Sequence, residues 1–217
     1  MKKFLLSLAV VLGLVAASPA FAADAENTLN LDTQYGRVVI EMRPDLAPKH
    51  VARIKELVRK GFYDGLTFHR VIKGFMAQGG DPDGNGTGGS GQNIEAEFSS
   101  EPFKRGVVGM ARSSDPNSGD SQFFIMFEDG FFLNGQYTVW GVVTSGMEFV
   151  DKLAMGEPPA SPDKIIKMQI AADEAPAAPV PAPAEAAPAE APAAEAPAAE
   201  APADQAPETA PVPAPAQ

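Results

Sequence analysis

The sequence contains no cysteine and only two histidines, His50 and His69. The absence of cysteine excludes disulfides, a thiol nucleophile, a lipid anchor on cysteine and Cys-ligated metal centres. Two histidines are also too few for a histidine-rich metal site. Basic residues are scarce, because 17 Lys and Arg stand against 28 Asp and Glu, a formal net charge of −11. A surface of this charge repels a phosphate backbone, so we expect no nucleic-acid partner.

Residues 1–22 have the pattern of a secretory signal peptide. Two lysines near the start precede an apolar run of 14 residues, and Ala20 and Ala22 fit a small-residue cleavage site. The run is shorter than the roughly 20 residues that span a bilayer. We therefore expect cleavage after Ala22, no stable membrane anchor after cleavage, and a periplasmic location, with secretion as the alternative.

Residues 171–217 differ sharply in composition from the rest of the chain. They contain 22 Ala, 12 Pro and 8 acidic residues, with no basic and no aromatic residue. Such a segment cannot bury a core, and its frequent prolines exclude a continuous helix. We predict a disordered, extended C-terminal tail that acts as a solubilising spacer, with a partner-binding role as the alternative.

Residues 23–170 remain as one domain of 148 residues, with 15 basic and 20 acidic residues and 19 of the 20 glycines. Short apolar runs bounded by Gly, Pro, Asp or Asn favour antiparallel β structure over βαβ units. Strands are expected near residues 29–31, 38–42, 66–72, 75–78, 94–98, 107–111, 122–127, 139–143 and 166–170. A helix is predicted from Pro48 to Lys60, before Gly61, and a second one near residues 147–155. This pattern predicts a β-barrel of about eight strands with two helices.

Two glycine-rich patterns point to no ligand. Residues 86–91 match a dinucleotide-binding fingerprint, but a strand and not a helix is expected after them. Residues 81–86 begin like a calcium-binding EF-hand loop, yet its twelfth position is Gln92, which cannot supply the bidentate carboxylate. We predict a flexible loop without a bound metal.

Residues 68–81, with the sequence FHRVIKGFMAQGGD, combine apolar side chains with one guanidinium and one amide. In an extended strand, Phe68, Arg70 and Ile72 would share one face. Residues 122–127 add an aromatic strand in which Phe124 alternates with neighbours that we expect in the core. An apolar surface beside Arg70 is predicted.

These stretches resemble the cyclophilin family of peptidyl-prolyl cis–trans isomerases. Residues 68–81 are similar to the family signature FHRVI-x-GFM-x-QGGD, residues 85–89 to NGTGG and residues 121–125 to SQFFI, and the likeness extends over 28–170. The resemblance implies a closed eight-stranded antiparallel β-barrel capped by two α-helices. It implies an isomerase that acts on proline-containing polypeptides and assists the folding of exported proteins. A non-catalytic proline-peptide-binding module or chaperone is the alternative.

The resemblance also implies roles for individual residues, with Arg70 as the catalytic arginine. The implied substrate-binding residues are Phe75, Met76, Gln78, Gly86, Ala111, Arg112, Ser113, Gln122, Phe124, Phe132, Leu133 and Tyr137. No covalent bond changes during rotation about a peptide bond, so no metal or other cofactor is expected, and a monomer is the default.

Some positions depart from the pattern of many eukaryotic members. Phe132 stands in place of Trp, Tyr137 in place of His, Arg112 in place of Asn and Lys73 in place of Pro. These choices resemble the bacterial exported branch and argue against tight binding of cyclosporin. Trp140 is expected in the core, His69 as a structural residue, and His50 exposed in the first turn of the first helix.

Overall fold

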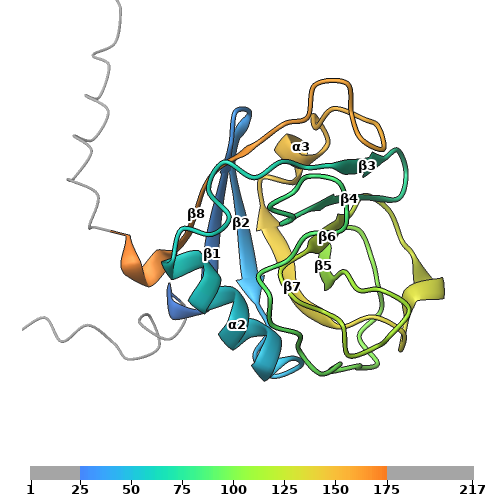
Figure 1. Ribbon diagram of the computed structural model, residues 1–217. Coiled ribbons are helices and arrows are strands. Elements are labelled where there is room, and N and C mark those ends of the chain that lie inside the picture. The colour runs from blue at the N-terminus through green and yellow to red at the C-terminus, as the bar shows by residue number, and fades with distance from the viewer. Residues whose placement is uncertain (1–24, 175–217) are drawn as a thin grey trace, which may run out of the picture. The chain divides into compact units, whose positions relative to one another are not determined.

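The computed structural model describes residues 25–174, which form a mainly β domain (Figure 1). The predicted signal peptide lies outside the described residues, and so does the predicted 171–217 tail from residue 175 on. The first residues of that predicted tail are not disordered, since Ala171–Asp173 form a 3₁₀ turn and Glu174 pairs with Arg37. The strands are β1 Thr28–Thr33, β2 Gly36–Met42, β3 Arg70–Ile72, β4 Met76–Gly79, β5 Val107–Met110, β6 Phe123–Met126, β7 Val139–Ser145 and β8 Ile165–Ile170. The helices are α2 Pro48–Arg59 and α3 Met147–Val150, with two 3₁₀ turns, η1 Phe131–Leu133 and η2 Ala171–Asp173.

The eight strands form a single sheet in the order β3-β4-β6-β5-β7-β2-β1-β8, and every neighbouring pair is antiparallel. The predicted first hairpin is confirmed, since β1 and β2 pair with Leu31 opposite Val38. Short turns connect β1 to β2 and β3 to β4, whereas long loops carry the chain from β4 to β5. This curled sheet places β3, β4, β5 and β6 together on one side of the domain (Figure 1).

The prediction of a fully closed barrel is wrong in one respect, because no continuous ladder joins the end strands β3 and β8. The two ends meet through a few backbone contacts between the residues just before β3 and the start of β8, where the Ile165 amide donates to the Leu66 carbonyl at 2.8 Å. Thr67 and Lys164 form an isolated bridge, and the Phe68 amide donates to the Asp163 carbonyl at 2.9 Å. The contact does not extend into a ladder, because β3 is only three residues long and its edge away from β4 pairs with Gly156 at Val71.

Helix α2 begins at Pro48, as its sequence predicts, and ends at Arg59, one residue before the predicted end at Lys60. Ala47 offers no side-chain cap, and the carboxylate of Glu97 takes that place by accepting the Lys49 and His50 amides, both at 3.0 Å. His50 also contacts Glu97 through Nδ1 at 2.7 Å and is 1% exposed. The expectation of an exposed His50 is therefore wrong, because the capping carboxylate draws the imidazole inward.

The strand expected at residues 94–98 is not formed. Only Ile94 makes an isolated bridge, to Gly119, while the amides of Ala96 and Glu97 donate to side chains. Side-chain acceptors therefore replace the neighbouring strand that the alternating pattern indicated.

The second helix is also shorter than the predicted 147–155. After Val150 the Leu153 amide donates to Val150 in a tighter turn, and the Ala154 amide donates to the Asp163 carboxylate at 2.7 Å. The α-helix ends after one turn because the Lys152 and Leu153 amides donate only three residues back, to Phe149 and Val150, and the Ala154 amide then bonds to a side chain.

Two apolar clusters fill the domain. The larger lies between the sheet and α2 and contains Trp140, which is fully buried as predicted. Phe123, Ile125 and Phe127 belong to it too, as expected. Phe68 also joins this cluster, so it does not share the face of Arg70: the strand begins only at residue 70, and the alternation breaks before it.

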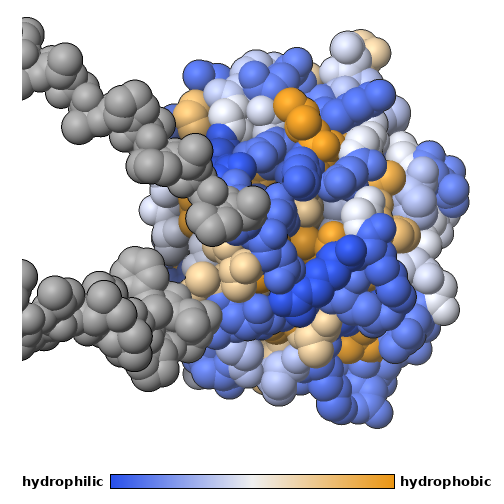
Figure 2. Space-filling model, turned by 90° about the vertical axis from the view of Figure 1, so that its left-hand side faces the viewer, coloured by the Kyte–Doolittle hydropathy of each residue, from blue (hydrophilic) through white to orange (hydrophobic). Residues whose placement is uncertain are grey.

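The surface toward α2 and β8 is mainly hydrophilic, with small apolar areas separated by polar ones (Figure 2). Within residues 25–174, no helix has the length and apolar character needed to cross a membrane.

Candidate active site

Arg70, Gln78 and Phe124 form a row across three neighbouring strands. In the antiparallel registers, Arg70 of β3 stands opposite Gln78 of β4, and Gln78 stands opposite Phe124 of β6. Opposed residues of antiparallel strands project on the same face of the sheet. The Gln78 amide nitrogen donates to Gln122 Oε1 at 2.8 Å, which holds the amide of the row in place.

A small cavity of about 130 Å³ opens on this face. It is lined by Arg70, Phe75, Met76, Gln78, Ala111, Arg112, Phe124, Leu133 and Tyr137. Met76, Phe124 and Leu133 are buried and belong to the second apolar cluster, so the cavity floor is itself part of the core. The volume is below the roughly 300–1,000 Å³ of pockets for drug-sized ligands, so the cavity suits one small apolar group.

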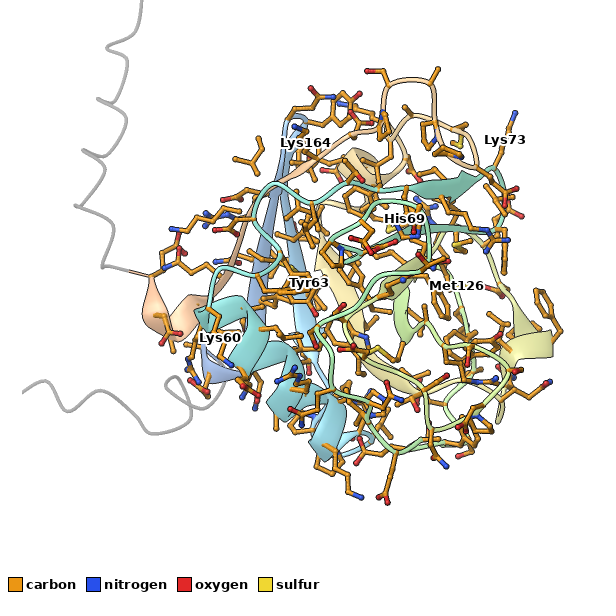
Figure 3. The ribbon with its side chains drawn as sticks, in the orientation of Figure 1. Lys60, Tyr63, His69, Lys73, Met126 and Lys164 are labelled. Carbon is orange, nitrogen blue, oxygen red and sulfur yellow. The ribbon has the colours of Figure 1, made fainter. Side chains whose placement is uncertain are left out.

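Arg70 stands at the edge of the cavity with its side chain 40% exposed. Its Nε donates to Glu157 Oε2 at 2.7 Å. Within residues 25–174, neither terminal nitrogen of the guanidinium makes a hydrogen bond, so both remain able to donate to a ligand. Lys73 lies at the tip of the β3–β4 turn, points outward (Figure 3) and takes no part in the cavity.

Aromatic rings line the same cavity as Arg70. The rings of Phe124 and Tyr137 meet edge to face at 5.8 Å, and Phe103 stacks beneath Phe124 at 5.7 Å. The guanidinium of Arg112 lies 4.5 Å from the Tyr137 ring centre and donates to the Gln136 carbonyl. These contacts hold the Phe124 and Tyr137 rings and the Arg112 guanidinium in one arrangement.

A second, larger cavity of about 350 Å³ adjoins the first. The two share Gln78, Ala111 and Arg112, so together they form one elongated groove. Gly86, Ser113 and Gln122 line only this second part.

The segment after β5 that borders this groove is not a strand, because β5 ends at Met110. The Ala111 amide donates to the Gln122 carbonyl at 2.9 Å, and the Ser113 amide donates to the Ser118 hydroxyl at 2.9 Å. Individual hydrogen bonds to Gln122 and Ser118 thus hold this rim instead of a ladder.

Asp81 organises the glycine-rich loop that borders the second cavity. Its carboxylate accepts the amides of Asp83, Asn85 and Gly86, and these bonds lower its pKa although burial opposes that shift. His69 lies against the same loop inside the domain (Figure 3), and burial lowers its pKa. The residues that resemble the start of a calcium loop therefore bind their own backbone amides.

Phe132 is the one expected substrate-binding residue that lines neither cavity. It is 66% exposed, and its ring lies 5.6 Å from that of Phe75 at the cavity edge. The residues that the sequence reasoning missed include Asp120, which lines the second cavity, and Glu157, the partner of Arg70. Asp120 lies two residues before Gln122 and could have been found by proximity, whereas nothing in the proline-rich stretch around Glu157 indicates its contact.

The site combines the guanidinium of Arg70, the side-chain amides of Gln78 and Gln122, and an apolar cavity. Among residues 25–174, no cluster of three or more His, Asp or Glu side chains could hold a metal ion. The arrangement can grip a small ring and donate hydrogen bonds beside it.

Comparison with known proteins defines the class. Residues 28–170 match the family model "Cyclophilin type peptidyl-prolyl cis-trans isomerase/CLD". The crystal structure of cyclophilin AquaCyp293 from Hirschia baltica is similar with a TM-score of 0.65 and 31% identity, covering 75% of this chain and 84% of that one. The domain has the cyclophilin fold.

Two further relatives agree. A Brucella suis protein named "Probable peptidyl-prolyl cis-trans isomerase" is 58% identical over 181 residues, covering 76% of this chain and 92% of its own. A Cryptosporidium parvum cyclophilin solved in the presence of the dipeptide Ala-Pro has a TM-score of 0.62 and 30% identity, covering 66% of this chain and 98% of that one. The chain belongs to the cyclophilin-type peptidyl-prolyl cis–trans isomerase family.

Proposed function

We propose that this isomerase binds proline-containing polypeptides in the groove, with the proline ring in the 130 Å³ cavity and Arg70 as the catalytic residue. The observation that carries the proposal is the pair of unbonded terminal nitrogens of Arg70 at the edge of a ring-sized apolar cavity. The relative solved in the presence of Ala-Pro supports the choice of ligand. The larger cavity is then available to residues next to the proline.

The residues suit the reaction because rotation must break amide resonance, a barrier of about 18–20 kcal/mol. An apolar cavity removes water from the amide, and water favours the planar, polar form. As the bond twists, the lone pair localises on the prolyl nitrogen, and a guanidinium nitrogen can donate to it. A donor that acts mainly on the transition state is commonly worth about 3 kcal/mol.

Arg70→Ala tests this assignment in a peptide NMR exchange experiment with an X-Pro peptide. We expect a loss of about 10²-fold in turnover, the rate equivalent of one preorganised donor. Arg59→Ala is the matched control, because Arg59 is also a partly exposed arginine in ion pairs, on α2. Equal turnover in both variants would reject Arg70 as the catalytic residue. Binding of the peptide by the wild-type protein without faster exchange would instead select a non-catalytic binding module.

We also infer that the protein assists the folding of exported proteins in the periplasm. The support lies in residues 1–22, whose basic start, apolar run and Ala20-x-Ala22 ending fit an export signal. N-terminal sequencing of the mature protein from a periplasmic fraction should begin at Ala23. An intact Met1 in the cytoplasmic fraction would contradict the inference.

A further inference from the structure

Glu157 lies opposite Arg70 in a short antiparallel pairing outside the eight-stranded ladder. The Val71 amide donates to the Gly156 carbonyl at 2.8 Å, and the Gly156 amide donates back to Val71 at 2.9 Å. In such a pair, the residue before Val71 stands opposite the residue after Gly156. The ion pair between Arg70 Nε and Glu157 Oε2 at 2.7 Å follows from this register.

The pairing adds Glu157 to the row of active-site residues formed by Arg70, Gln78 and Phe124. Arg70 has Gln78 opposite it on one side and Glu157 on the other, and Gln78 in turn faces Phe124. Glu157, Arg70, Gln78 and Phe124 therefore succeed one another across the same face. The catalytic guanidinium sits between a carboxylate and an amide that are both held by the backbone.

The backbone at Glu157 is itself well anchored. Gly156 has φ +147°, and a Cβ atom there would lie 2.6 Å from Pro159 Cα, so only glycine fits this bend. On the other side of the pairing, Val71 is 2% exposed in the main core. The backbone that carries the Glu157 carboxylate is therefore fixed in position, even though the Glu157 side chain is 53% exposed.

An exposed ion pair of this kind adds little to folding stability, so its geometric effect on Arg70 matters more. A bond at Nε restricts the long arginine side chain to rotamers that place Nε beside Glu157. The terminal nitrogens Nη1 and Nη2 are then left for the ligand. Without the carboxylate, the guanidinium would sample other rotamers and spend less time in the reactive geometry.

We propose that Glu157 is a positioning residue that holds Arg70 for catalysis, an inference that rests on the proposed function of Arg70. Glu157→Ala should lower kcat by about two- to fivefold, the range of a partly exposed ion pair, and leave KM unchanged. Glu157→Gln keeps an acceptor oxygen and should retain more turnover than Glu157→Ala. The control is Glu148→Ala, which removes an equally negative, exposed side chain from α3.

Two measurements separate positioning from a merely structural role. In the Arg70→Ala background, Glu157→Ala should have no further effect on kcat. Salt should lower the turnover of the wild type toward that of Glu157→Ala, because an exposed pair is screened, while the variant's turnover should stay level. A Glu157→Ala variant that behaves like Glu148→Ala, that turns over faster, or that loses the same factor without Arg70 overturns the inference. If Arg70→Ala itself keeps full turnover, the proposed function fails first.

Discussion

Gly109→Ala tests whether the space behind the Phe124 ring is essential. Gly109 lies in β5 directly opposite Phe124 of β6. A Cβ atom at this position would lie 2.4 Å from Phe124 Cζ and 2.7 Å from Phe103 Cε1. Both rings are buried, at 5% and 0% exposure, so neither can swing into solvent.

The cost follows from overpacking alone, because the strand backbone accepts alanine. Inserting a methyl group into a filled core costs about 1–3 kcal/mol of folding stability. Because the added methyl group meets two buried rings, we expect a loss of about 3 kcal/mol for Gly109→Ala. For a domain of this size, that lowers Tm by about 6–12 °C. Phe124 lines the cavity of about 130 Å³, so the displaced ring should enter it. We expect kcat/KM to fall by about tenfold or more, since small misplacements in a site are costly.

Thermal unfolding by circular dichroism and exchange of an X-Pro peptide by NMR measure the two effects. Gly65→Ala is the control: Gly65 has φ +82° and nothing within 4 Å of its added Cβ atom. It should cost about 1–2 kcal/mol of backbone strain and leave turnover unchanged. Shortening the neighbour in Gly109→Ala/Phe103→Leu should restore part of the activity. If Gly109→Ala has the same Tm and the same turnover as the wild-type protein, the steric reasoning is refuted.

Three further predictions concern the supports of the site and are each checked by chemical or thermal unfolding. Replacing Asp81 by Ala leaves three loop amides without their acceptor and should cost about 1–3 kcal/mol; an unchanged midpoint would contradict the role of Asp81. Glu97→Ala removes the N-terminal cap of α2 and the partner of His50, with an expected loss of about 1–2 kcal/mol. Burial lowers the pKa of His69, which lies near Asp81 and Arg70. The unfolded chain therefore takes up the proton first, so stability should be full above about pH 6.5 and decrease as the pH falls below it. His69→Gln should flatten that decrease, and identical pH profiles would argue against it.

Much of the site could be predicted because its residues are local in sequence. Residues 68–81 supply both β3 and β4, so Arg70 and Gln78 meet through a single tight turn. The contribution of Phe124 also follows from alternation, since its neighbours Phe123 and Ile125 enter the main core. Period-2 patterns indicate the faces of such strands well.

Long-range side-chain contacts account for what the sequence did not reveal. Residues 94–98 alternate like a strand, yet Glu97 serves as the cap of a helix that begins 49 residues earlier, at Pro48. The same contact buries His50, which looks like an exposed residue of a first helical turn. Glu157 meets Arg70 across 87 residues of chain. No local propensity encodes which distant carboxylate will satisfy an amide or a guanidinium.

The two faces of β6 contribute to different apolar clusters, one in the main core and one under the cavity. In β6, Phe123 and Ile125 fill the main core, while Phe124 and Met126 fill the second cluster under the cavity. The cavity floor is therefore held by the same burial that stabilises the fold, and it cannot be altered without cost. Arg70 stands outside this apolar framework, partly exposed and joined to one exposed carboxylate. Since such a pair contributes only about 0–1 kcal/mol, Arg70→Ala should fold normally, and any loss of turnover can be assigned to the missing donor.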